Sequence, residues 1–297
     1  MRRAVLIVNP FSTAVTEARV TAVEAVLRTR VELVTRLTEA KGHAAEIAAE
    51  AARTADAVIV FSGDGTYNEA INGADGSVPF GFLPGGGTSV LSRALGLPRD
   101  PVAAAEQVAA ALSGDRTRRI SLGRVNGRRF CFASGIGLDA ELIRRVDGRG
   151  RRPDGRRARN SAFITSFVGL LVDQRLRIAP RLEVVGRGPA AFLLVANGRP
   201  YTYAGPVPML VNRAAGFEDG LDFVAPRSMT PLSLPLMLLR AFRGSLAEAP
   251  GVISGHDVAS LEVRCDRPMA LQADGEDLGD VTHALFEAEP DAISVLV

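Results

Sequence analysis

A chain of 297 residues, of which 47% are hydrophobic and 23% charged, has room for two domains of ordinary size and a substantial core. Its formal net charge of +2 is too small to favour nucleic acid as a partner, and no basic surface interleaved with aromatic residues appears. Cys131 and Cys265 lie in apolar, strand-like surroundings, and the three histidines lack zinc spacing. We therefore expect reduced core thiols in a cytoplasmic protein.

The first ~115 residues alternate between strand and helix patterns. An apolar run predicts a strand buried on both faces at residues 4–8, and a second run predicts a buried strand at 57–61. Residues 31–37 and 78–83 are further strand candidates. Helical spacing, alanine-rich sequence and turn signals predict helices after residue 12, up to residue 53, after residue 66, between residues 89 and 96, and over 100–113. We therefore expect a doubly wound α/β domain over residues 1–118.

From residue 119 onward the pattern changes to short alternating runs bounded by turn residues. These runs predict antiparallel strands at 120–132, 181–185, 190–197, 220–225, 259–265 and 268–273. Helical segments are predicted at 139–145, 161–173 and 231–242. We expect a second, β-rich domain over residues 119–287, and a closing strand within 288–297 that returns to the first domain.

The chain is organised around the turn that follows the strand at 57–61. Ser62-Gly63-Asp64-Gly65-Thr66 is expected to lead into a helix, with Thr66 capping it and Glu69 reaching back in a capping box. A glycine turn at a helix start gathers backbone N–H groups and binds anions, most often phosphate. Asp64 would repel a polyphosphate, so we assign it to Mg²⁺ or to an attacking hydroxyl. A plain Asp-Gly turn that caps a helix stays an equal alternative.

A second glycine turn, Pro84-Gly85-Gly86-Gly87-Thr88-Ser89, follows the strand at 78–83. In a doubly wound sheet both turns lie along the edge where ligands bind, together with the loop at 9–12. A di- or triphosphate would suit the two turns, with Asn9 and the loop at Thr38 on the nucleoside side. Neither turn is a Walker A loop or a Gly-x-Gly-x-x-Gly motif, so Rossmann-type NAD binding is disfavoured.

These motifs, in their order along the chain, resemble the catalytic domain of the diacylglycerol kinase family, which includes soluble bacterial lipid kinases and, more distantly, sphingosine kinases. The resemblance rests on a set that covers nearly the entire chain: Val8-Asn9-Pro10, the Ser62–Thr66 turn with Asn68-Glu69, Leu83-Pro84 with the turn at 85–89, Gly135-Ile136-Gly137-Leu138-Asp139-Ala140, Asn197-Gly198, Glu218-Asp219-Gly220-Leu221-Asp222 and Asp274-Gly275-Glu276. The Gly-Asp-Gly turn alone also resembles NAD kinases and phosphofructokinases.

The resemblance implies an ATP-binding α/β domain and a β-sandwich-like lipid domain, with the active site in the cleft between them. The implied reaction transfers the γ-phosphoryl group of ATP to a lipid hydroxyl with Mg²⁺, most simply from ATP to diacylglycerol, giving phosphatidic acid. Asp64 would be catalytic and would hold the metal. The residues expected to contact the nucleotide are Asn9, Pro10, Thr38, Ser62, Gly63, Gly65, Thr66, Glu69, Gly85, Gly86, Gly87, Thr88 and Ser89.

Two further roles are implied by the resemblance and have ordinary alternatives. Glu276 matches a position suspected as the general base for the lipid hydroxyl, although Asp274-Gly275 is a good type I′ hairpin turn and a glutamate after it is often simply exposed. Asp219 and Asp222 match an acidic loop that can hold a structural metal, and an Asp-Gly turn entering a strand is an equal alternative.

The sequence departs from the family pattern in both glycine turns. Ser62 replaces the first glycine of the usual Gly-Gly-Asp-Gly-Thr, which is a mild change if φ is negative there. Ser89-Val90 aligns with a common Asn-Asp, and valine cannot bind a cation. A catalytically weak nucleotide- or lipid-binding regulator is therefore the alternative to a lipid kinase. A kinase for a sphingoid lipid, or for a soluble acceptor such as NAD, is a third.

Membrane contact is expected to be peripheral. The run at residues 4–8 ends at Asn9-Pro10, too early for a signal peptide, and the apolar stretch at 229–242 is too short and broken to span a bilayer. Residues 144–159, from Arg144 to Arg159, hold eight arginines in sixteen residues. A solvated loop is the simpler interpretation, and docking on anionic lipid at the inner membrane face is the sharper one. The sequence leaves a homodimer open.

Overall fold

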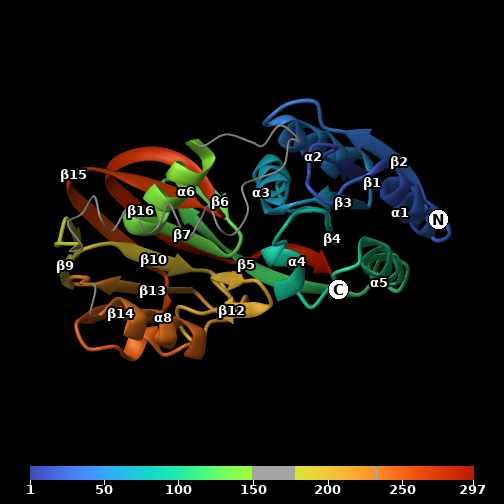
Figure 1. The fold of residues 1–297 in the computed structure, drawn as a ribbon. Helices are drawn as coiled ribbons and strands as arrows, with labels where there is room; N and C mark the ends of the chain where they lie inside the picture. The colour runs from blue at the N-terminus through green and yellow to red at the C-terminus, as the bar shows by residue number, and fades with distance from the viewer. Residues whose placement is uncertain (149–177, 231–232) are drawn as a thin grey trace. The chain divides into compact units, whose positions relative to one another are not determined.

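The structure, a computed structural model, describes residues 1–148, 178–230 and 233–297 (Figure 1). The helix predicted at 161–173 and most of the arginine-rich segment at 144–159 lie outside the described residues. The chain forms two compact units: the first unit comprises Met1–Ile120 and Asp291–Val297, and the second unit comprises Ser121–Pro290.

The first unit is built on a parallel sheet in the order β2-β1-β3-β4, with the last residues of β16 alongside β4. The strands are β1 (Arg2–Val8), β2 (Val31–Leu37), β3 (Ala57–Ser62), β4 (Phe80–Pro84) and β16 (Glu276–Leu296). Every residue of β3 and β4 is buried, which explains why these strands read as unbroken apolar runs. Val295 of β16 pairs with Phe80, so the end of the chain completes this sheet.

Helices cover the sheet of the first unit on both sides (Figure 1). They are α1 (Glu17–Arg28), α2 (His43–Thr54), α3 (Asp64–Gly73), α4 (Val90–Ala94) and α5 (Pro101–Ser113). α1 packs against α5, and α2 packs against α3. Gly73 makes the α2–α3 contact possible, because a Cβ added there would lie 2.1 Å from the Ala45 carbonyl oxygen.

The second unit is dominated by antiparallel strands in the order β14-β13-β10-β7-β15-β16, with smaller hairpins beside them. Its strands are β5 (Thr117–Val125), β6 (Arg128–Phe130), β7 (Ala133–Ile136), β8 (Leu182–Val184), β9 (Gly188–Ala190), β10 (Leu193–Ala196), β11 (Thr202–Ala204), β12 (Val207–Met209), β13 (Leu221–Pro226), β14 (Val252–Val258) and β15 (Ser260–Ala273). The helices in the described part of this unit are α6 (Leu138–Gly148), α8 (Leu234–Arg243) and the 3₁₀ helix η1 (Leu246–Glu248). Phe130, Phe223 and Phe286 are fully buried in its main core.

The predicted fold class, a doubly wound α/β domain followed by a sheet-rich region, is confirmed. Two strand predictions were wrong in detail. The run at 120–132 is two strands, because Asn126 and Gly127 both have positive φ (48° and 84°) and form a tight turn between β5 and β6. The runs at 259–265 and 268–273 are one strand, β15, whose pairing with β16 shifts register between Arg264 and Met269, around Pro268.

None of the helices in the described ranges is long and apolar enough to cross a membrane. Cys131 and Cys265 are not joined in a disulfide; Cys131 is buried and Cys265 is half-buried. Burial raises the pKa of Cys265 to about 11, which keeps its thiol protonated at neutral pH.

Candidate functional site

The two glycine turns of the first unit touch each other. The Gly85 amide donates to the Ser62 carbonyl oxygen at 2.6 Å, and a Cβ added to Gly86 would lie 2.7 Å from the Gly63 Cα. Gly63 has φ −99°, which other residues adopt readily, so it is the close approach of the two backbones that requires glycine here. The strand ends bring both turns to one place, as the sheet-edge argument predicted.

Asp64 ties the first turn to the second. Its Oδ2 accepts the Val90 amide at 2.9 Å and its Oδ1 accepts the Leu91 amide at 3.0 Å, so the carboxylate caps the start of α4. A carboxylate is favourable at this positive end of a helix. These two bonds orient the carboxylate beside the second turn. A carboxylate is a typical protein ligand of Mg²⁺.

Side-chain hydrogen bonds between hydroxyl and amide groups connect the first turn to the loop after β1. The Thr66 hydroxyl accepts from Asn9 Nδ2 at 3.0 Å and lies 2.7 Å from Ser62 Oγ, which in turn lies 2.7 Å from Ser12 Oγ. Ser62 is the last residue of β3, where extended backbone suits serine as well as glycine. Ser12 was not singled out from the sequence, because nothing local shows that its hydroxyl reaches a residue fifty positions away.

The predicted capping box at Thr66 and Glu69 was wrong. α3 begins at Asp64 with Gly63 as its N-cap residue, so Thr66 already lies inside the first turn of the helix. Its hydroxyl bonds to Ser62 and Asn9 instead, and Glu69 Oε2 accepts the Gly42 amide at 3.0 Å. Glu69 therefore fastens the loop between β2 and α2 to α3.

The remaining predicted nucleotide contacts lie around these turns. Thr38 follows β2, is buried, and donates its amide to the Val8 carbonyl at the end of β1, next to Asn9. Pro10, Gly87 and Thr88 are exposed. The structure therefore brings the strand-end loops of β1 and β2 together, and it joins the two glycine turns at the ends of β3 and β4.

The second glycine turn is stabilised by an internal hydrogen bond to the side chain of Ser89. The Ser89 hydroxyl accepts the Gly86 amide at 3.2 Å, and Ser89 has φ 48°, in the left-handed region. The next residue, Val90, is only 3% exposed, so its side chain packs into the interior. Tyr67, which the sequence did not single out, is fully buried and donates to the Leu83 carbonyl oxygen at 2.5 Å, holding α3 against the strand that leads into this turn.

In the second unit, the predicted type I′ turn at Asp274-Gly275 is confirmed by φ values of 48° and 79°. The Asp274 carboxylate accepts the amides of Cys131, Phe132 and Ala133 at 2.6, 3.0 and 3.1 Å. Glu276, the first residue of β16, forms an ion pair with Arg128 at 2.9 Å, and its side chain is 18% exposed. It is therefore neither simply exposed nor buried, and Arg128 orients it.

Replacing Asp274 with alanine is expected to lower the free energy of unfolding by about 3 kcal/mol, because three buried amides lose a charged acceptor. Asparagine tolerates the left-handed backbone and keeps one acceptor oxygen, so Asp274→Asn is expected to cost about 1 kcal/mol. Urea denaturation of both variants measures the difference. Equal losses for the two variants would show that the carboxylate's amide bonds are not what stabilises the turn.

A buried cluster of polar side chains is hydrogen-bonded to the Asp274-Gly275 turn through Gln272. Asp139 Oδ2 accepts from the Tyr201 hydroxyl and from Gln272 Nε2, while Gln272 Oε1 accepts the Gly275 amide at 3.0 Å. Burial raises the pKa of Asp139 above its ordinary value of 3.8, against the lowering effect of these hydrogen bonds. Only Asp139 appears among the motif residues; Tyr201 and Gln272 join it through long-range strand pairing that no local pattern shows.

The raised pKa of Asp139 gives a pH prediction with a definite sign. The folded state holds this proton more tightly than the unfolded state, so the stability linked to it is present below pH 3.8 and is lost as pH rises through the folded pKa. We expect the free energy of unfolding of the wild type to fall more, or rise less, than that of Asp139→Asn between about pH 4 and pH 7. Denaturant titrations across this range, compared as the difference between the two proteins, provide the test; parallel curves would contradict it.

The predicted acidic loop is organised around Asp222. This carboxylate is fully buried, and its Oδ1 lies 2.6 Å from Asn212 Nδ2 and 2.9 Å from His256 Nδ1, while its Oδ2 is buried without a hydrogen-bond partner. An orphaned buried oxygen suits a cation. However, no group of three or more His, Cys, Asp or Glu side chains in the described ranges is arranged to hold a metal. A structural metal at Asp219 and Asp222 therefore stays a prediction.

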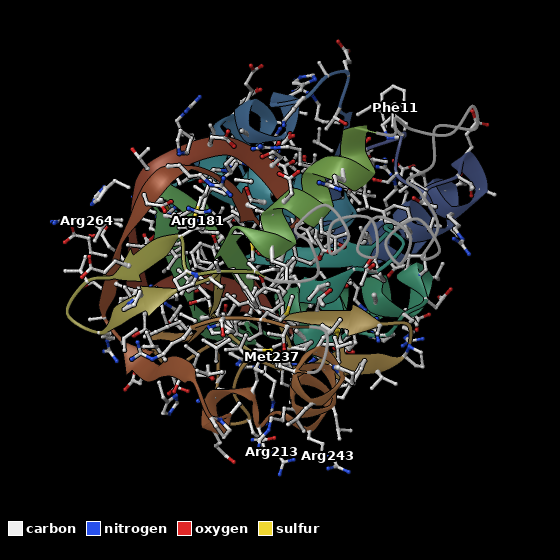
Figure 2. All side chains as sticks on the ribbon, turned by 60° about the vertical axis from the view of Figure 1, so that its left-hand side comes forward. Phe11, Arg181, Arg213, Met237, Arg243 and Arg264 are labelled. Atoms are coloured by element: carbon white, nitrogen blue, oxygen red, sulfur yellow. The ribbon has the colours of Figure 1, made fainter. Side chains whose placement is uncertain are left out.

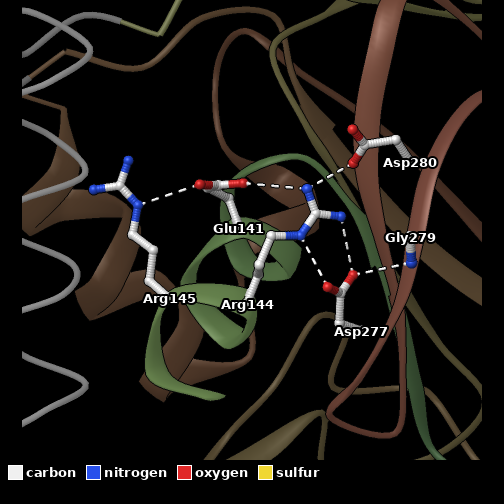
Figure 3. A network of polar contacts seen from close by, with 6 residues as sticks. All are labelled: Glu141, Arg144, Arg145, Asp277, Gly279 and Asp280. Carbon is white, nitrogen blue, oxygen red and sulfur yellow. Dashed lines mark hydrogen bonds and ion pairs between the residues drawn. The ribbon is translucent and has the colours of Figure 1, made fainter. Parts of the chain in front are cut away.

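Only Arg144 and Arg145 of the arginine-rich segment are described with their contacts, and both are paired with acids (Figure 3). Arg144 Nε lies 2.9 Å from Asp277 Oδ2 and its Nη1 lies 2.6 Å from Asp280 Oδ1, while Arg145 pairs with Glu141 at 3.2 Å. The hydrogen bond to Asp277 is the main reason that the pKa of Arg144 is raised. Arg144 therefore fastens α6 to β16, and Arg145 pairs within α6, so neither presents a bare cation to a lipid surface.

An open parallel sheet with glycine turns at the carboxyl ends of two adjacent strands is the arrangement of α/β domains that bind ligands at this edge. Residues 3–125 match the sequence model of the diacylglycerol kinase catalytic domain. The chain is 30% identical over 262 residues to a diacylglycerol kinase of Mycobacterium tuberculosis, covering 84% of this chain and 79% of the relative. The chain therefore belongs to the diacylglycerol kinase family.

Other proteins are similar to this chain over different shares of its length. A diacylglycerol kinase of Bacillus subtilis is 37% identical over 115 residues, a match that covers 37% of each chain, and thus well under half of that relative. A crystal structure of a diacylglycerol kinase from Bacillus anthracis has a TM-score of 0.71 at 18% identity, covering 99% of this chain and 96% of that one. An NAD kinase from Archaeoglobus fulgidus, in complex with ATP, has a TM-score of 0.55 at 13% identity, covering 99% and 93%. These two structures share the fold.

Proposed function

We propose that the protein transfers the γ-phosphoryl group of ATP to the hydroxyl of a lipid, with diacylglycerol as the acceptor and phosphatidic acid as the product. One observation carries this proposal beyond family membership: two glycine turns in backbone contact, joined by the carboxylate of Asp64. Phosphoryl transfer mostly requires positioning and neutralisation of charge, which suits a site of backbone amides and few side chains. The ATP-bound NAD kinase of the same fold supports ATP as the donor.

In this proposal the two turns, residues 63–66 and 85–89, hold the phosphates, while the Gly85 and Gly86 amides donate within the turns to Ser62 and Ser89. Asn9, Pro10 and Thr38 belong to the loops on the nucleoside side, and Glu69 of α3 holds one of these loops through the Gly42 amide. The lipid oxygen forms a bond to the γ-phosphorus as the bond to the β–γ bridging oxygen breaks, and ADP leaves. The hydroxyl proton passes to Glu276, which Arg128 orients. Mg²⁺, where bound, neutralises charge on the phosphates, and a single carboxylate such as Asp64 is typical of its protein ligands in such sites.

The test is transfer of labelled phosphate from ATP to diacylglycerol dispersed in detergent micelles, with sphingosine and NAD as parallel acceptors. Transfer to diacylglycerol in preference to the other two supports the proposal. Transfer to sphingosine alone would show that the acceptor is a sphingoid lipid and not diacylglycerol. Transfer to NAD alone would show that the acceptor is not a lipid.

A second function is favoured by one observation. Val90, aligned with a common aspartate, is buried in the interior and supplies no ligand. A nucleotide- or lipid-binding regulator with weak or absent catalysis would have this feature. Binding of Mg²⁺-ATP without transfer to any of the three acceptors would favour the regulator over the kinase.

A further inference from the structure

Helix α8 of the second unit exposes large apolar side chains. Its inner side packs through Leu234, Met237 and Ala241 against neighbouring core clusters. The opposite side leaves Leu236, Leu238, Leu239 and Phe242 exposed by 52%, 38%, 44% and 40%. A surface helix normally places polar residues on its outer face, so an apolar outer face indicates that something other than water contacts it.

Arginines gather at the C-terminal end of this helix. The Arg213 guanidinium donates to the Arg243 carbonyl oxygen at 2.5 Å, and Arg199 donates to the Arg213 carbonyl oxygen at 2.8 Å. Figure 2 shows Arg213 and Arg243 side by side, with Met237 on the inner part of the helix. The helix itself adds no negative charge, because α8 has no Asp or Glu.

These arginines differ from other exposed arginines of the second unit. Within the described residues, Arg199, Arg213 and Arg243 have no acidic partner, whereas Arg181 pairs with Asp266 at 3.3 Å and Arg264 pairs with Glu262 at 2.9 Å. Figure 2 shows Arg181 and Arg264 well away from α8. The positive charge at the end of α8 is therefore left for an external anion.

We infer that α8 docks the second unit on an anionic lipid bilayer. The docking surface, here called the α8 surface, consists of Leu236, Leu238, Leu239 and Phe242 with Arg213 and Arg243. An interfacial helix buries apolar side chains at the headgroup–acyl boundary while arginines bind anionic headgroups, and both features are present here. A second copy of the chain fits less well, because two clusters of unpaired arginines would face each other. The inference deepens the proposed function: a lipid acceptor is then taken from the bilayer itself.

The apolar part of the α8 surface is tested by Leu236→Ser/Leu239→Ser/Phe242→Ser in a vesicle sedimentation assay. The vesicles contain phosphatidylglycerol and phosphatidylcholine in equal amounts. We expect binding about tenfold weaker than wild type, since these side chains supply the buried apolar area. The matched control is Leu37→Ser/Val185→Ser, which removes two exposed apolar side chains elsewhere and is expected to bind as wild type does.

The charged part is tested by Arg213→Ala/Arg243→Ala, which is independent of the first variant should that one fail to fold. Each basic residue near an anionic surface contributes about a fivefold gain in binding, so the double variant should bind roughly 25-fold more weakly. The control Arg181→Ala/Arg264→Ala removes the same formal charge from acid-paired positions and should change binding little. Vesicles of phosphatidylcholine alone should bind wild type and both arginine variants weakly and alike.

The outcomes separate docking from catalysis. Vesicle binding requires no turnover, so it tests the α8 surface even if the proposed kinase reaction is wrong. If the kinase reaction is right, the α8 variants should lose transfer to diacylglycerol in vesicles yet keep wild-type transfer in detergent micelles. Unchanged vesicle binding by both variants would overturn the inference. So would a wild-type dimer that the apolar variant converts to a monomer in size-exclusion chromatography, because the face would then bind a second copy.

Discussion

Asp64→Ala is expected to reduce phosphoryl transfer from ATP by about a hundredfold to a thousandfold, the size of effect seen when one group that stabilises transition-state charge is removed. The same change is expected to lower the free energy of unfolding by about 1–3 kcal/mol, because the Val90 and Leu91 amides lose their acceptor. The two effects have different causes, and a single alanine variant cannot separate them. Transfer rates and urea denaturation are therefore measured together.

Asp64→Asn provides the separation. Its side-chain oxygen still accepts one of the two α4 amides, so most of the stability should return. The negative charge that would bind Mg²⁺ or polarise the acceptor is gone, so transfer should stay low. If Asp64→Asn kept wild-type transfer, the carboxylate would only cap α4 and would have no role in the reaction.

Gly86→Ala is expected to weaken ATP binding by about a hundredfold, because a shift of about 1 Å in a positioning group can have an effect of this size. The added Cβ would lie 2.7 Å from the Gly63 Cα, a distance that forces the two glycine turns apart. Overpacking of this kind also costs about 1–3 kcal/mol of stability. Isothermal titration with Mg²⁺-ATP and urea denaturation measure the two effects.

The matched control is the adjacent Gly87→Ala. A Cβ added at Gly87 meets no heavy atom within 4 Å, so the turn should keep its shape and its stability. Gly87→Ala is therefore expected to lose little affinity for ATP, whereas Gly86→Ala is expected to lose much more. Equal ATP affinities for the two variants would mean that contact between the turns does not build the binding site.

The first unit could be predicted from sequence almost to its element boundaries. The apolar runs of β1, β3 and β4 are largely buried and stand out locally, whereas β2 mixes buried and exposed residues. The rule that parallel strands end at one edge correctly predicted that the turns after β3 and β4 meet. The partners of the turn residues could not be predicted in the same way. Asp64 binds amides 26 and 27 positions away, and the spacing of Thr66 and Glu69 suggested a capping box that the earlier start of α3 rules out.

The second unit was less predictable because its important contacts join distant segments. The Asp274-Gly275 turn is a local signal and was predicted, but the three amides that Asp274 accepts lie about 140 positions earlier in the chain. The acidic partners of Arg144 are equally remote, so a count of arginines suggested a solvated loop, or alternatively lipid docking, and could not show the ion pairs that the described part forms. The outer face of α8 was visible only as an apolar stretch until the structure showed which of its sides is buried.

The central claim is that the two touching glycine turns hold the phosphates of ATP while Asp64 positions the metal. A crystal structure with Mg²⁺ and a non-hydrolysable ATP analogue tests it most directly. We predict phosphate oxygens within hydrogen-bond distance of backbone amides from both turns, residues 63–66 and 85–89, and a Mg²⁺ ion bound by Asp64 directly or through water. Triphosphate bound elsewhere, or touching one turn only with the metal away from Asp64, would contradict the account.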